Sequence, residues 1–232
     1  MVGCVQNATI NKYAYGTLHR YPKKDNKIQI KSVDFGLSIN YNVDEELVYD
    51  GKLDLIKAAI RKLGGQDSEG FDLFLHSDAP PGSGLGSSSA MMVCLVGLLK
   101  DFKNLPLTDY EIAHLAYVIE RKELGIKGGL QDQYAATFGG FNFIEFYKDR
   151  VIVNTLRISQ DCINELEHNL LLRYTGKTRL SDHIIEDQTR RYEQSEEEAL
   201  QGLRKQKELA VEMKNTLLQR RLNDFGGLLH SA

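Results

Sequence analysis

The chain has 232 residues, of which 42% are hydrophobic and 26% charged, and its formal net charge is −3. These proportions are typical of a globular protein with one large or two modest domains. The nearly balanced charge gives no electrostatic reason to expect nucleic acid or a membrane surface as a partner.

The positions of the cysteines, the histidines and the apolar segments exclude further classes of protein. Cys4, Cys94 and Cys162 are too far apart for a disulfide framework or a cysteine metal site, and no two of the six histidines have zinc-site spacing. Residues 1–10 lack the basic start and apolar centre of a signal peptide, and the apolar run 91–99 is too short to cross a bilayer. We therefore expect a cytoplasmic protein in a reducing compartment.

The first part of the chain mixes strand and helix patterns. Alternating side chains predict strands over residues 8–21 and 27–33. Helical spacing predicts a helix over 53–63, which ends at a glycine pair. A strand over 71–76 should place Phe71, Leu73 and Leu75 on one face, and the run 91–99 then predicts a buried helix.

The middle of the chain is divided by glycine pairs. Thr108 and Glu111 have the spacing of a capping box, which predicts a helix start there and an end near Gly125. A short helix is expected over 130–136. A hairpin is then predicted from strands over 141–147 and 150–156.

Composition shifts near Ser159, where we place a domain boundary, giving domains 1–158 and 159–232. A strand is predicted over 169–174 and a polar loop over 175–179. A second capping box over 195–198 opens a charged helix, whose apolar stripe is Ala199, Leu203, Ala210, Met213 and Leu217. We interpret its charges as a solvated face, because their signs alternate. Interspersed strands and helices predict an α+β fold.

The most informative motif is the glycine- and serine-rich segment 80–90. Its glycines allow the backbone to approach a ligand, and its serines fall on the first turn of the predicted helix. A helix start offers unpaired N–H groups and a partial positive charge, which together suit phosphate. The alternative is a flexible linker, but linkers are not usually bracketed by a strand and an apolar helix. The segment is not a Walker motif, since no Lys-Ser or Lys-Thr follows its last glycine.

Two carboxylates are candidates for phosphoryl-transfer chemistry, which needs a metal ligand and a group that handles the acceptor's proton. Glu120 sits at the edge of an apolar stripe, where the alternative is a salt bridge with Arg121 or Lys122. Asp132 follows a glycine pair and opens a helix, where the alternative is a simple favourable interaction with the helix dipole.

These residues together resemble the GHMP kinases, the family of galactokinase, homoserine kinase and mevalonate kinase. Segment 80–90 resembles the family's central phosphate-binding motif, and segment 128–133, followed by Gly139-Gly140, resembles the segment with its catalytic aspartate. Within the family, segments 7–15, 119–121, 131–136 and 174–176 look most like the bacterial D-glycero-D-manno-heptose 7-phosphate kinases.

The resemblance implies two domains: an amino-terminal α/β domain with a left-handed βαβ crossover and an incomplete ferredoxin-like carboxy-terminal domain. It implies ATP and Mg²⁺ as cofactors, with Mg²⁺ held by Ser88 and Glu120 and the sugar hydroxyl served by Asp132. The residues expected around the ATP phosphates are Pro81, Gly82, Ser83, Gly84, Leu85, Gly86, Ser87, Ser88 and Ser89. Asp132 should then face the amides around Gly86 across a narrow gap.

The expected acceptor is the anomeric hydroxyl of a heptose 7-phosphate, with Lys177 and Arg179 as candidate partners of its phosphate. Simple surface charge is the alternative for these two residues. The family's first and last glycine-rich motifs have no counterpart here, so both ends look cut. A kinase for fucose, galactose or mevalonate, and a non-catalytic nucleotide- or sugar-binding module, therefore stay open as alternatives.

Overall fold

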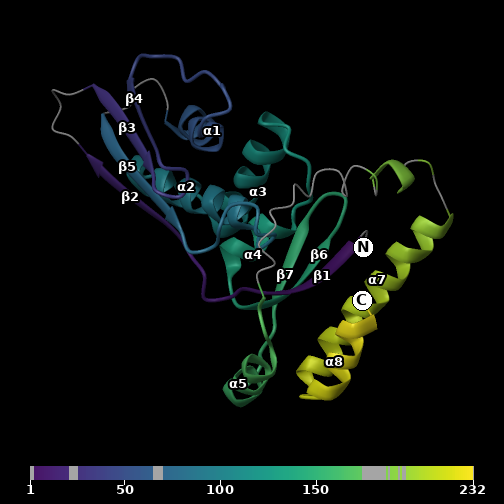
Figure 1. The fold of residues 1–232 in the computed structure, drawn as a ribbon. Helices are drawn as coiled ribbons and strands as arrows, with labels where there is room; N and C mark the ends of the chain where they lie inside the picture. Colours follow the sequence, from purple (N-terminus) through teal and green to yellow (C-terminus); the bar gives the residue numbers. More distant parts are fainter. Residues whose placement is uncertain are drawn as a thin grey trace. The chain divides into compact units, whose positions relative to one another are not determined.

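A computed structural model describes residues 3–20, 26–64, 70–173, 187, 189–192, 194 and 197–231. Its contacts divide the chain into two compact units, drawn in Figure 1. Among the described residues, the central unit holds those within 11–137. The terminal unit holds 3–10, 138–173 and those from 187 onward. These units cut the chain differently from the domains 1–158 and 159–232, which stay a prediction about family domains.

The central unit is built on a four-stranded sheet in the order β2-β5-β3-β4. Its strands are β2 (Ala14–Arg20), β3 (Lys27–Ser32), β4 (Leu37–Asn42) and β5 (Phe71–Ser77). β3 and β5 are parallel, whereas the other two pairings are antiparallel. Strand β4 returns the chain to the edge of the sheet where β3 begins, and helix α1 (Asp54–Leu63) then leads to the start of β5 at that same edge.

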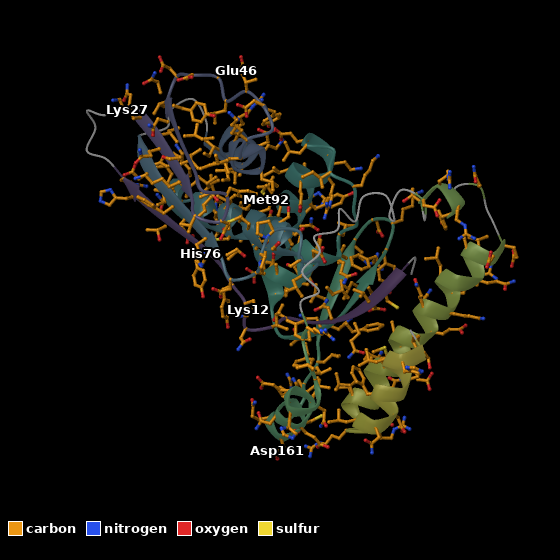
Figure 2. All side chains as sticks on the ribbon, viewed as in Figure 1. Lys12, Lys27, Glu46, His76, Met92 and Asp161 are labelled. Atoms are coloured by element: carbon orange, nitrogen blue, oxygen red, sulfur yellow. The ribbon has the colours of Figure 1, made fainter. Side chains whose placement is uncertain are left out.

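Helices α1, α2 (Ser87–Lys103) and α3 (Asp109–Tyr117) pack with this sheet around one core. Phe71, Leu73 and Leu75 of β5 are buried on one face, as predicted. Met92, labelled in Figure 2, lies on α2 and is fully buried in the same core. The predicted helix over 91–99 is thus confirmed and longer at both ends. Its start at Ser87 puts the three serines in the first turn.

The capping box of α3 is also confirmed. Thr108 accepts from the Glu111 amide, and the Glu111 carboxylate accepts from the Thr108 amide. The helix continues into a π-helical turn, η1 (Val118–Glu123), and α4 (Gln131–Phe138) follows.

The terminal unit has an antiparallel sheet in the order β1-β6-β7, from β1 (Gly3–Ala8), β6 (Phe141–Phe146) and β7 (Val151–Thr155). The predicted hairpin is confirmed as β6 and β7. Helices α5 (Gln160–Asn169), α7 (Glu197–Leu218) and α8 (Leu222–Ser231) surround a small core. Its buried members are Cys162, Leu166, Leu217 and Phe225.

The prediction of a strand over 169–174 is wrong for residues 169–173, which the structure describes. Asn169 ends α5, and 170–173 have no regular structure. Leu171 is 90% exposed. A short apolar run forms a strand only where another strand pairs with it, and none of the described strands pairs with this one. The loop 175–179 and the capping box over 195–198 fall on residues outside the described ranges.

Strands β1 and β4 and helix α5 were not predicted. Across the described ranges, no helix is long and apolar enough to cross a membrane.

Candidate active site

The phosphate-binding loop runs from Pro80 into the first turn of α2. Gly82, Gly84 and Gly86 have φ of 73°, 77° and 69°, a left-handed backbone that residues with a Cβ rarely adopt. Gly86 is the N-cap of α2 and supplies no side-chain hydrogen bond. The first turn therefore offers its amides to a ligand.

Several polar groups of this loop have no hydrogen-bond partner among the described residues. The Ala90 amide makes the first bond of the helix, to the Gly86 carbonyl at 2.9 Å, so the preceding amides have no partner within the helix. The Ser83 hydroxyl is buried and unpartnered among the described atoms. The Ser83 amide, in contrast, donates to the Pro80 carbonyl at 3.1 Å and is already used in the loop.

Glu120 lies fully buried beside the first turn of α2. The Ser88 hydroxyl donates to Glu120 Oε1, and the Ser89 hydroxyl donates to Glu120 Oε2, both at 2.7 Å. The Gln133 amide donates to Glu120 Oε2 at 2.5 Å. Arg121 Nη1 is 3.8 Å from Glu120 Oε1, so the salt bridge considered as an alternative exists only as a long contact. Three donors hold this carboxylate in place.

A π-helical turn holds two adjacent charged residues that are both largely buried. The Leu124 amide bonds the Ile119 carbonyl at 3.1 Å, five residues back, which widens the helix by one residue. Glu120 and Arg121 lie in this turn, and their side chains are 1% and 11% exposed. Such turns inside helices occur frequently at functional sites.

Asp132 lies at the start of α4 and against the phosphate-binding loop. A Cβ built on Gly86 would stand 3.4 Å from the Asp132 carboxyl carbon. This confirms the expected narrow gap between Asp132 and the loop. Burial raises the pKa of Asp132, and the charge of Glu120 raises it further, whereas the Arg121 guanidinium lowers it.

Two residues of the cluster had no site role assigned from the sequence. Gln133 is fully buried and donates to both Glu120 and Ser89, the latter at 3.1 Å. Arg121 had been considered only as a salt-bridge partner. A fully buried glutamine is unusual, but its burial is a tertiary property. Only its place beside Asp132, in the segment of family resemblance, could have indicated it.

A cavity of about 400 Å³ opens beside the loop. Pro81, Gly82, Ser87 and Ser88 line one side of it. Apolar side chains dominate elsewhere, among them Phe35, Leu53, Leu75, Met91, Leu124 and Ile126. The polar edge at the loop and the apolar interior suit a ligand with an anionic and an aromatic part.

A buried cation supports one wall of this cavity. The fully buried Lys57 of α1 donates to the Val48 carbonyl at 2.9 Å, to Asp54 Oδ1 at 3.3 Å and to the Asp50 carboxylate. These bonds tie down loop 48–54, which contributes Leu53 and Asp54 to the lining.

The structure thus brings together most of the predicted site residues. One cluster contains Gly86, Ser88, Ser89, Glu120 and Asp132. Leu85 is 42% exposed. Lys177 and Arg179 fall on residues outside the described ranges, so their role stays a prediction.

The sequence signature of the GHMP kinases N terminal domain matches residues 53–140, which contain the whole cluster. A D-glycero-alpha-D-manno-heptose 7-phosphate kinase of Campylobacter jejuni is 43% identical over 97% of this chain and 66% of its own length. A crystal structure of a D-glycero-D-manno-heptose 1-phosphate kinase from Bacteroides thetaiotaomicron superposes with a TM-score of 0.82. It is 37% identical, over 98% of this chain and 68% of that one.

The chain belongs to the GHMP kinase family. The family resemblance and the GHMP kinase fold expected from the sequence are thereby confirmed. A galactokinase structure from Lactococcus lactis, at 20% identity and a TM-score of 0.70, agrees in fold. The chain spans about two thirds of the length of the heptose phosphate kinases that it matches.

Proposed function

We propose that the protein is an ATP-dependent kinase that phosphorylates a sugar hydroxyl. The observation that carries this proposal is the placement of Asp132 against Gly86 of the phosphate-binding loop, beside Ser88 and Glu120. A proton acceptor, a phosphate cradle and a set of oxygen ligands are the parts that phosphoryl transfer needs.

ATP fits the loop and the adjacent cavity. Its phosphates would accept hydrogen bonds from the unpaired amides at the start of α2, where the helix dipole favours negative charge. Its base and ribose would occupy the cavity of about 400 Å³, whose apolar walls can cover a purine.

Ser88 and Glu120 suit a magnesium ion. Among the described residues, no group of three or more histidine, cysteine, aspartate or glutamate side chains could hold a metal. Magnesium, however, uses one or two carboxylates and takes its other ligands from water and phosphate oxygens. The Ser88 hydroxyl lies 2.7 Å from Glu120 and lines the cavity, so both oxygens fit this ligand set. When bound, magnesium would neutralise charge on the phosphates.

Asp132 is the proposed proton acceptor. The sugar hydroxyl oxygen attacks the γ-phosphorus, the bond from that phosphorus to the β-γ bridging oxygen breaks, and ADP leaves. The hydroxyl proton passes to the Asp132 carboxylate. Because an alkanol is a far weaker acid than a carboxylic acid, the proton transfers late, after the new bond has begun to form.

The proposed acceptor is a D-glycero-D-manno-heptose phosphate, because the two heptose phosphate kinases described above are named for such substrates. Lys177 and Arg179 stay proposed as partners of its phosphate, and the cytoplasm as its location.

The test is ADP release from ATP, magnesium and a panel of free and phosphorylated heptoses, hexoses and fucose. The chain is assayed with whatever sequence flanks it in its gene. A heptose phosphate should give the highest kcat/KM. Asp132→Asn should lower kcat by about a thousandfold or more and leave ATP binding by calorimetry nearly unchanged. ATP binding without acceptor-dependent ADP release would favour a nucleotide-binding module instead.

A further inference from the structure

The guanidinium of Arg121 connects two parts of the candidate active site. Nη1 donates to the Lys127 carbonyl at 3.0 Å, and Nη2 donates to the Ser89 hydroxyl at 3.5 Å. Lys127 precedes α4, which begins with Asp132 in its first turn, whereas Ser89 lies in the first turn of α2. One side chain therefore bridges the start of α2 and the turn that leads to Asp132.

The guanidinium also packs against the backbone of this turn. A Cβ built on Gly128 would stand 2.5 Å from Arg121 Cζ and 2.8 Å from both terminal nitrogens. Real Cβ atoms do not approach that closely, so the position accepts only glycine while Arg121 keeps its place. The route of the chain from Lys127 to α4 is shaped around this side chain.

Charge pairing alone does not account for the placement. Among the described residues, the only carboxylate oxygen within 4.0 Å is Glu120 Oε1, which is 3.8 Å from Nη1 and beyond hydrogen-bond distance. The Arg121 Nε is buried and has no partner among the described atoms. An arginine whose role is an ion pair usually binds a carboxylate with two parallel hydrogen bonds. Arg121 instead contacts a carbonyl, a hydroxyl and a glycine.

We propose that Arg121 is a positioning residue that fixes the turn 127–129 and thereby holds Asp132 against the phosphate-binding loop. The proposal rests on the proposed function for its effect on turnover, but the structural part stands without it. Arg121 holds the start of α4 from one side, while Gln133 holds it through Glu120 and Ser89.

The consequence is a separation of turnover from nucleotide binding. Without the guanidinium, the turn 127–129 can move into the vacated space and displace Asp132. A misplacement of about 1 Å can cost about a hundredfold in rate. Arg121 does not line the cavity that would bind ATP, and its contact with the first turn of α2 is a 3.5 Å bond to the Ser89 hydroxyl. The KM for ATP should therefore change by less than about threefold.

The experiment compares Arg121→Ala and Arg121→Lys with Arg20→Ala. Arg20 is a matched control, since its guanidinium also donates to a backbone carbonyl, that of Phe102, and stacks on an aromatic ring away from the site. Turnover, KM for ATP, rescue by added guanidinium ion and amide hydrogen exchange without nucleotide or metal are measured on each.

Arg121→Ala should lower kcat by about a hundredfold. Added guanidinium ion should raise the kcat of this variant by at least about tenfold. Arg121→Lys should also be slow, because an ammonium cannot bridge both acceptors. Exchange of the amides in 127–133 should speed up by about tenfold or more in Arg121→Ala, but should be unchanged in Arg20→Ala.

Exchange in 127–133 at the wild-type rate in Arg121→Ala would overturn the proposal, whatever the turnover. So would wild-type kcat in that variant. Absence of kinase activity in the wild-type protein would instead remove the proposed function, and the exchange measurement would still decide whether Arg121 orders the turn.

Discussion

The carboxylate of Asp132 lies where a side chain on Gly86 would meet it, since a Cβ at Gly86 would stand 3.7 Å from Asp132 Oδ1. Gly86 also has a left-handed φ of 69°, which strains any other residue. Gly86→Ala should therefore lower both kcat and stability, the latter by about 1 kcal/mol or more. Denaturant unfolding and steady-state kinetics measure the two effects.

Gly97→Ala is the control for this substitution. Gly97 lies inside the same helix, and a Cβ there would meet nothing within 4 Å. Alanine should stabilise the helix by about 0.5–1 kcal/mol and leave turnover unchanged. Equal effects of the two changes would contradict the role given to Gly86.

The buried carboxylate of Asp132 should give the protein a measurable pH dependence. Its pKa is raised, chiefly by burial, so the folded protein binds this proton more tightly than the unfolded chain does. The ionised carboxylate thus destabilises the fold at neutral pH, and this cost disappears as pH falls through the raised pKa. Asp132→Asn should melt at a higher temperature than wild type at pH 7, with a difference that shrinks at acid pH.

The same shift predicts the acid side of the rate profile. The carboxylate must be ionised to accept a proton, so kcat/KM, which reports the free enzyme, should fall on acidification at a pH above the ordinary aspartate value of about 3.9. A rate that stays constant down to that ordinary value would count against Asp132 as the acceptor.

Ser88 and Ser89 allow the magnesium site to be tested with a matched pair. Each hydroxyl donates to Glu120 at 2.7 Å, but only Ser88 lines the cavity. Ser88→Ala should raise the magnesium concentration needed for half-maximal rate by about tenfold, and should weaken magnesium-dependent binding of ATP in calorimetry. Ser89→Ala should act mainly on stability. A larger magnesium effect from Ser89→Ala would place the ion elsewhere.

The capping box offers a test of the fold alone. Thr108→Ala removes the side-chain acceptor for the Glu111 amide and should cost about 1 kcal/mol in urea unfolding. Ser159→Ala is the comparison, because Ser159 is the N-cap of α5 but makes no side-chain cap bond. The second substitution should cost less.

Glu111 makes that difference depend on pH. Hydrogen bonds from Thr108 lower the pKa of Glu111, so its contribution to stability is present above its unfolded pKa and is lost as pH falls through the lower folded value. The deficit of Thr108→Ala should therefore be smaller at low pH.

Local signals predicted most helices, the hairpin and the loop with its serines on the first helical turn. Each of these depends on residues close in sequence, such as the four residues from Thr108 to Glu111. The pairing of β1 with β6 joins residues more than 130 positions apart and leaves no local pattern. Strand β4 was missed even though Leu37, Ile39 and Tyr41 alternate as a strand requires.

The sequence predicted the site residues that would face a ligand, but it did not predict the residues that hold these side chains in place. Glu120 and Asp132 are the residue types that phosphoryl transfer needs, so chemistry and family resemblance both indicated them. Gln133 and Arg121 act through a buried hydrogen-bond network. Only folding brings their partners within reach.

The candidate active site depends on the π-helical turn at Val118–Glu123, which interrupts the regular α-helix. Deleting one residue from the turn would restore ordinary α-helical bonding and rotate the side chains on one side of the deletion by about 100° relative to the other. Either Glu120 and Arg121 or the segment that follows them toward α4 would then leave its present place. A relative that lacks one residue of this turn would have a more regular helix. Such a relative would be expected to have lost catalytic activity, even if its helix were more stable.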